Sequence, residues 1–187
     1  MIKELVKNNR TVRTFKDVKL SEELLRDLVE MARLSMCTRN SQALKYKIVN
    51  DAKDVEELHN ASVFAGTLKD FNPTVNEGPK SYIIVYVDTD ISNVINLAHV
   101  DSGIAMANMT LLAREKGFSS VIIGSFDKVR ITKYFNLGDI YIPIYLVGLG
   151  EADEEVHIVD VVDNDIKYYR EENNNYVPKR NLEDIIL

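Results

Sequence analysis

Two arginines, Arg10 and Arg13, are the first side chains in this sequence whose spacing could serve chemistry. They enclose Thr11 and Val12, and in an extended segment Thr11 and Arg13 point to the same side because side chains alternate along a strand. Arg10 can reach that side from the turn before it. Two guanidinium groups and a hydroxyl would make a site for a phosphate group. The alternative is a pair of solvated arginines beside the acidic helix that follows.

Two polar groups later in the chain could also meet a ligand. Asn40, Ser41 and Gln42 present amide and hydroxyl groups in succession. Amides both donate and accept hydrogen bonds, which suits the edge of a heterocycle that mixes carbonyls and ring nitrogens. Gly124 and Ser125 end an apolar run, where glycine lets a ligand approach the backbone closely. Both patterns are equally typical of ordinary loops and strand ends.

The tail of the chain contains a second basic pair, Lys179 and Arg180, which allows the same two interpretations as the first pair. The single cysteine, Cys37, excludes an internal disulfide framework and cannot build a zinc site. No histidine lies close to Cys37 in the sequence, so we interpret it as a structural residue rather than a nucleophile. The sequence therefore indicates no metal site.

Composition limits the classes of protein that fit. A chain of 187 residues with 45% apolar residues predicts one globular domain with a sizeable core. A net charge of -6 argues against a broad surface for nucleic acid or anionic membrane. The longest apolar runs are far too short to span a bilayer, and the N-terminus lacks a signal-peptide pattern. We therefore expect a cytoplasmic protein that binds neither nucleic acid nor membrane.

Hydrophobic periodicity predicts helices that alternate with strands. Ser21, followed by two glutamates, predicts the N-cap of a helix that ends near Leu34. The run 81–88 is apolar almost throughout, which predicts a central strand buried on both faces. The other predicted elements are a first helix ending at the two asparagines 8 and 9, helices at 54–61 and 96–116, strands at 45–50, 119–124 and 141–150, and a loop or lid at 66–79.

These elements predict a layered domain of helices and strands with a mixed sheet. No G-x-G-x-x-G or G-K-S/T signature follows a strand, so neither a Rossmann dinucleotide site nor a P-loop is indicated. The motifs instead resemble, in order and over nearly the whole chain, those of the FMN-dependent nitroreductase family. The segments that carry the resemblance are "NRTVRTF", "ARLSMCTRNSQ", "HVDSGIAMANMTLLAREKGFSSVIIGSF", "YLVGLGEAD" and "VPKRNLEDII". Each motif is weakly specific, but the ordered series is specific.

The resemblance implies a fold and an assembly. The fold would be a three-layer αβα domain of the α+β class with a mixed sheet, and residues 1–187 would form a single nitroreductase-like domain. Two copies would form an intertwined homodimer with FMN at the interface and the long helix 96–116 between the subunits. The C-terminal tail, residues 151–187, would wrap the partner subunit.

The resemblance also implies roles for the residues described above. The expected activity is transfer of hydride from NADH or NADPH, through FMN, to a small conjugated acceptor such as a nitroaromatic or a quinone. No side chain need act as an acid or base, because the flavin carries the chemistry. The expected flavin contacts are Arg10, Thr11 and Arg13 on the phosphate and ribityl chain, Asn40, Ser41 and Gln42 on the flavin, Gly124 and Ser125 beside its reactive nitrogen, and Lys179 or Arg180 on the phosphate again.

Other functions remain open within this resemblance. The same fold could support reductive dehalogenation, flavin destruction or a non-catalytic flavin-binding dimer. Three departures from the family pattern bear on the site: Asn9 stands where a further arginine is frequent, Arg39 stands where a small residue is common, and Ala43 and Leu44 replace a frequent Pro-Trp pair. The first would weaken the grip on phosphate, and the other two concern the substrate side.

Overall fold

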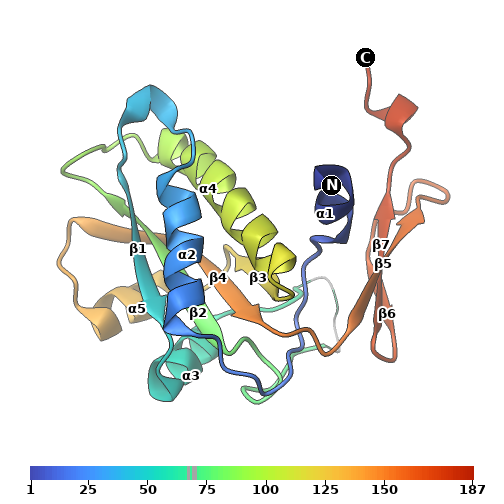
Figure 1. The fold of residues 1–187 in the computed structure, drawn as a ribbon, viewed down its shortest axis with the longest axis horizontal. Helices are drawn as coiled ribbons and strands as arrows, with labels where there is room; N and C mark the ends of the chain where they lie inside the picture. The colour runs from blue at the N-terminus through green and yellow to red at the C-terminus, as the bar shows by residue number, and fades with distance from the viewer. Residues whose placement is uncertain (67, 69–70) are drawn as a thin grey trace.

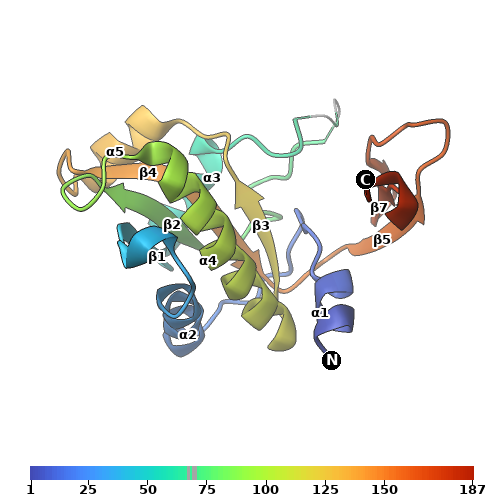
Figure 2. The same cartoon turned by 90° about the horizontal axis from the view of Figure 1, so that it is seen from above.

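A computed structural model describes residues 1–66, 68 and 71–187 of the chain. Part of the predicted loop at 66–79 therefore lies outside the described residues. The structure has three layers, with a four-stranded sheet between two pairs of helices (Figures 1 and 2). The predicted α+β, three-layer arrangement is confirmed.

The central sheet has the strand order β1-β2-β4-β3 and antiparallel neighbours throughout. Strand β2 lies between β1 and β4, and every one of its residues is buried, as its apolar sequence predicts. The pairing of β2 with β4 shifts between Val85 and Tyr86, opposite Pro143, because proline interrupts a ladder. The strands are β1 (Leu44–Val49), β2 (Ser81–Asp88), β3 (Ser119–Ile123) and β4 (Tyr141–Gly150).

Helices α2 (Glu22–Arg33) and α4 (Ile95–Glu115) cover one face of the sheet, and α3 (Ala52–Ala61) and α5 (Lys128–Phe135) cover the other (Figure 2). Alternate residues of β2 enter the two apolar cores that result. Ser21 caps α2 by accepting a hydrogen bond from the Leu24 N–H at 3.1 Å, as predicted. The predicted site residues 40–42 lie just before β1, and Gly124 and Ser125 lie just after β3.

The short helix α1 (Ile2–Asn8) leads into an extended segment, residues 9–16, which we call the arm. The arm lies beside β3, the edge strand of the sheet: Thr11 forms an isolated parallel bridge with Ser120, and the Val12 N–H donates to the Ser120 carbonyl at 3.0 Å. Asn9 ties the start of the arm to α4 by donating to Thr110 Oγ1 at 2.9 Å. The arm thus covers part of an exposed sheet edge.

The tail after Ala152 forms a separate three-stranded sheet beyond α1 (Figure 1). In this sheet, β5 (Glu155–Asp160) pairs with β7 (Asn174–Lys179) in parallel, and β6 (Tyr169–Glu171) pairs with β7 in antiparallel fashion. The 3-10 turn η2 (Leu182–Asp184) follows. Mixed strand directions therefore occur in the tail and at the parallel bridge between Thr11 and Ser120, whereas the named strands of the central sheet are all antiparallel. That the tail wraps a partner stays a prediction.

Candidate functional site

Four of the predicted site residues line one cavity of about 210 Å³, which we call the arm cavity. Thr11 and Arg13 enter it from the arm, and Gly124 and Ser125 enter it from the end of β3. Val12, between the first two, is buried in the core instead. The alternation expected of an extended segment is therefore present, and it brings together residues more than a hundred positions apart in the sequence.

Backbone hydrogen bonds hold the walls of the arm cavity. The Val63 N–H donates to the Ser125 carbonyl at 2.9 Å, which places the segment 63–66 beside the end of β3. Ser62 and Phe126 form an isolated antiparallel bridge next to it. Gly124 has an ordinary backbone conformation, but a Cβ atom there would lie 3.3 Å from the Tyr145 ring. Space beside Gly124 is therefore tight for a side chain larger than alanine, whereas its backbone conformation does not require glycine.

The guanidinium group of Arg13 is oriented by an aromatic ring. Its Cζ atom lies 4.7 Å from the centre of the Tyr168 ring, and Tyr168 also lines the arm cavity. The Arg13 backbone N–H donates to the Glu154 carboxylate. Within residues 1–66, 68 and 71–187, no carboxylate forms an ion pair with the Arg13 side chain. Its N–H groups are therefore available to an anion in the cavity.

Three other predicted phosphate ligands lie elsewhere. Arg10 donates to the Val6 and Asn9 carbonyls, at 3.0 and 2.8 Å, and lines a different cavity with Arg114 and His157. Lys179 ends β7, and Arg180 donates to the Asn164 side chain at 3.2 Å. Within this chain, Thr11 and Arg13 therefore line the same cavity, whereas Arg10, Lys179 and Arg180 lie outside it.

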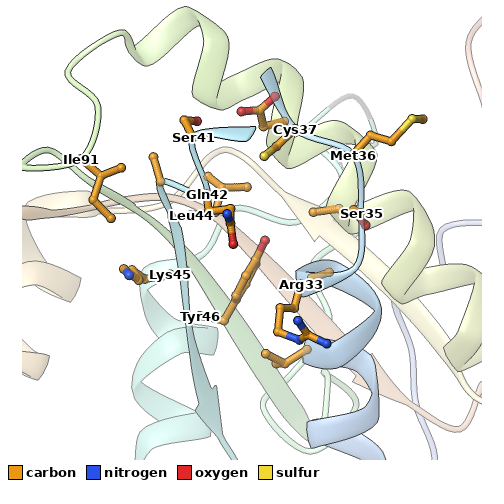
Figure 3. Close-up of a pocket in the computed structure, with 15 residues that line it drawn as sticks. Arg33, Ser35, Met36, Cys37, Ser41, Gln42, Leu44, Lys45, Tyr46 and Ile91 are labelled. Carbon is orange, nitrogen blue, oxygen red and sulfur yellow. The ribbon is translucent and has the colours of Figure 1, made fainter. Parts of the chain in front are cut away.

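Ser41 and Gln42 line a larger cavity of about 570 Å³, which we call the loop cavity. It lies between α2, α4 and the start of β1, with Arg33 and Tyr46 projecting between α2 and β1 (Figure 3). Ala43 and Leu44, which depart from the family pattern, also line it. Among the residues that the structure describes, the arm cavity and the loop cavity share no lining residue.

The loop before β1 has a specific backbone conformation. Arg39, Asn40 and Gln42 all have positive φ, and the 3-10 turn η1 (Thr38–Asn40) interrupts the segment. The buried carboxylate of Asp101, on α4, accepts hydrogen bonds from the Thr38 N–H at 2.7 Å and from its hydroxyl at 2.8 Å. This anchor holds Ser41 and Gln42 at the cavity although the loop itself lacks regular structure.

The loop cavity is electrostatically distinct from the arm cavity. Burial raises the pKa of the Tyr46 hydroxyl far above its usual range, and the nearby Cys37 and Asp101 raise it further. Tyr46 therefore remains a neutral hydrogen-bonding group at any physiological pH. Cys37 is half-buried in the same cavity. The three histidine rings pack elsewhere, against Phe64, Tyr145 and Tyr176.

Sequence reasoning missed Tyr168, Glu154 and Tyr46. Glu154 lies in a run of three acidic residues, a pattern typical of a solvated turn, yet its side chain is fully buried. Tyr168 and Tyr169 form an aromatic pair in a polar tail, which is a signal that could have been used. Asp101 and Tyr46 carried no sequence signal, because a single polar residue in an amphipathic element is usually a surface residue.

Two kinds of feature are absent from the described residues. No helix there has both the length and the apolar character that a membrane span requires. No group of three or more histidine, cysteine or acidic side chains there could hold a metal ion.

Comparisons with known proteins agree with the fold. An NADPH-dependent oxidoreductase of Staphylococcus aureus is 26% identical in a match that covers 81% of this chain, and the chain spans only 65% of that relative's length. A nitroreductase family protein of Streptococcus pneumoniae aligns with a TM-score of 0.73 and 20% identity, over 87% of this chain and 96% of the other. An FMN-dependent nitroreductase of Clostridium difficile aligns with a TM-score of 0.69 and 20% identity, over 83% and 89%.

At these identities the structural matches establish the fold alone. The sequence itself carries the assignment further, because the model of the nitroreductase family matches residues 6–151, from the end of α1 through the whole central sheet. This chain belongs to the nitroreductase family.

Proposed function

We propose that this chain is one subunit of an FMN-dependent oxidoreductase that takes hydride from NADH or NADPH. The acceptor would be a small conjugated molecule such as a nitroaromatic or a quinone. The observation that carries the proposal is the arm cavity, which unites Thr11, Arg13, Gly124 and Ser125 in a member of the nitroreductase family. The names of the S. aureus and C. difficile relatives support NADPH and FMN respectively.

The donors of the arm cavity fit a phosphate ester. Arg13 offers a guanidinium group without a carboxylate partner among the described residues, and Thr11 adds a hydroxyl. Guanidinium and hydroxyl donors are the groups that proteins use for phosphate oxygens. Arg10 would contribute only if its side chain left the carbonyls of Val6 and Asn9. Lys179 and Arg180 would need a comparable rearrangement or a second subunit.

The other end of the arm cavity fits a planar ring. Gly124 and Ser125 are exposed at the end of β3, and the absence of a side chain at Gly124 leaves the backbone open to a ligand. When bound, FMN would supply the acceptance and delivery of hydride. Arg13 would bind the phosphate, and Gly124 and Ser125 would set how deeply the flavin ring enters the cavity. The side-chain amide of Gln42 would form hydrogen bonds with the edge of the flavin.

The separation of the two cavities favours a site built by two subunits. The arm cavity, at about 210 Å³, is smaller than the usual range of roughly 300 to 1,000 Å³ for cofactor pockets. Ser41 and Gln42 line the other cavity and not this one. A homodimer would complete the site if the arm cavity of one subunit met the 40–42 loop of its partner.

We predict that the protein is a stable dimer. The outward face of α4 exposes Val100, Gly103 and Ala107, and no atom of the described residues lies within 4 Å of a Cβ placed on Gly103. Apolar residues of the tail are exposed as well, and such surfaces usually have a partner. Light scattering at micromolar concentration should give about twice the 21.3 kDa of the chain.

The variant Gly103→Arg should shift the equilibrium towards monomer, because a charged side chain would enter the proposed contact. An exposed substitution of the same kind outside α4, Val129→Arg, serves as the control. If the parent protein has the mass of a single chain, the predicted dimer is wrong. If the Gly103→Arg variant keeps the mass of a dimer, the interface does not include this face of α4.

We expect Cys37→Ser to leave NAD(P)H-driven reduction nearly unchanged. Cys37 lines the loop cavity, but flavin rather than a thiol would carry the electrons. Steady-state turnover of the variant and the parent measures this directly. A loss of more than about a hundredfold, which is roughly 2.7 kcal/mol of barrier, would contradict a structural role for Cys37.

The acceptor is tested by comparing electron acceptors at fixed FMN and NADPH. Rates with a nitroaromatic and a quinone should exceed the rate of oxygen-dependent NADPH oxidation. If the rate of NADPH consumption is the same with and without an organic acceptor, the protein acts as an oxidase. The proposed acceptor class is then wrong.

A further inference from the structure

The tail of the chain enters the arm cavity through one side chain, Tyr168. This residue lies just before β6, far from the arm in sequence, and the Arg13 Cζ atom lies over its ring, 4.7 Å from the ring centre. A cation over a ring face is attracted by the ring and needs no hydrogen bond to it. Arg13 forms no ion pair among the described residues, so its N–H groups can still donate to an anion.

A second connection fixes the backbone of Arg13. The carboxylate of Glu154 accepts from the Arg13 backbone N–H and forms an ion pair with Arg170, and the Glu154 side chain has no solvent exposure. The Arg170 Cζ atom also lies over the Phe71 ring, 4.5 Å from the ring centre, and Arg170 donates to Asn175 Oδ1 at 3.4 Å. Every charged group of this connection has a partner, as buried charges require.

A neighbouring contact provides a comparison. Lys16, also in the arm, pairs with Glu151, but both side chains are substantially exposed, by 50% and 39%. Exposed pairs contribute little to the placement of a chain because solvent screens them. Backbone hydrogen bonds of Val12 and Thr14 fix the arm on either side of Arg13. The buried Glu154–Arg170 pair and the Tyr168 ring add the contacts that reach Arg13 itself.

We infer that the tail acts as a positioning element for Arg13: Tyr168 orders the guanidinium, and Glu154 with Arg170 orders the backbone beneath it, before FMN binds. This inference rests on the proposed function, because it takes the FMN phosphate as the ligand of Arg13. Its physical basis is conformational entropy. A free arginine side chain loses much rotamer freedom when it grips a ligand, and a side chain that is already ordered loses less.

The first test compares three tyrosine variants by FMN fluorescence quenching on protein stripped of flavin. Tyr168→Ala should raise the FMN dissociation constant about threefold to tenfold, since one rotamer-rich side chain is no longer ordered. Tyr168→Phe keeps the ring and should bind FMN as the parent does. Tyr169→Ala is the matched control, because Tyr169 is exposed and stacks on Tyr176 outside the cavity.

The second test asks whether Tyr168 acts through Arg13. In an Arg13→Ala background, Tyr168→Ala should change the FMN dissociation constant by less than about twofold, because the residue that it positions is gone. An equal loss in both backgrounds would show that Tyr168 contacts FMN directly and would overturn the positioning role. A parent-like Tyr168→Ala would overturn it as well.

Glu154→Gln tests the backbone part, with Glu151→Gln as its exposed control. Glu154→Gln should lower the thermal unfolding midpoint and weaken FMN binding, whereas Glu151→Gln should do neither. If Glu154→Gln does not fold, the tyrosine series decides alone, since Tyr168 is only half-buried. A parent protein that binds no FMN would refute the proposed function together with this inference. Normal FMN binding by the parent and all variants would refute the inference only.

Discussion

Arg13→Ala is expected to raise the FMN dissociation constant about ten- to a hundredfold while the rate of flavin reduction in the saturated protein stays nearly the same. A charge-assisted hydrogen bond contributes roughly 1.5 to 3 kcal/mol, which gives this range. The phosphate lies far from the reacting ring of the flavin, so Arg13 would stabilise ground and transition states equally. FMN titration of stripped protein and stopped-flow bleaching of saturated protein measure the two quantities separately.

Lys16→Ala is the matched control for Arg13→Ala. Lys16 lies in the same arm and is basic, but it points to Glu151 rather than into the arm cavity. The control should bind FMN like the parent. If Arg13→Ala also binds FMN like the parent, Arg13 is not a phosphate ligand and the placement of FMN in the arm cavity is wrong.

Gly124→Val is expected to have the opposite signature, with slower flavin reduction at nearly unchanged FMN occupancy. A Cβ at this position would already lie 3.3 Å from the Tyr145 ring, so a branched side chain must move either the ring or the segment 124–125. A displacement of about 1 Å near the reacting atoms can cost as much as a hundredfold in rate, and we expect at least a tenfold loss. Stopped-flow reduction of FMN-saturated protein by NADPH measures it.

The variant Gly124→Ala distinguishes steric crowding by a large side chain from any effect of replacing glycine on the backbone. Gly124 does not need a left-handed backbone, so alanine adds only one close contact and should retain most of the rate. A Gly124→Val protein that is reduced as fast as the parent would mean that the end of β3 does not face the flavin. Equal losses for alanine and valine would point to backbone mobility instead of crowding.

Much of the fold could be predicted because its signals are local. The apolar run of β2, the Ser21 cap and the alternation of Thr11, Val12 and Arg13 each depend on a few neighbouring residues. In each case local chemistry and tertiary structure require the same conformation, so the sequence pattern was sufficient.

The composition of the site was harder to predict because it depends on contacts between distant segments. Spacing alone placed Arg10 with Arg13, but backbone carbonyls nearby capture the Arg10 side chain. Glu154 lies in an acidic run that is typical of a surface turn, but its buried carboxylate accepts from the Arg13 backbone N–H and pairs with Arg170. The separation of Ser41 and Gln42 from the arm cavity has no sequence signal at all, because it follows from the positions of β1 and β3 at opposite edges of the sheet.

The central claim, that this chain is an FMN-dependent oxidoreductase, is tested most directly by the visible spectrum of the purified protein with FMN under anaerobic conditions. The spectrum should contain bound flavin, and NADPH or NADH should bleach it before any acceptor is added. Saturation with FMN and no bleaching by either nucleotide would identify a passive flavin binder, and no binding of FMN would contradict the account as a whole.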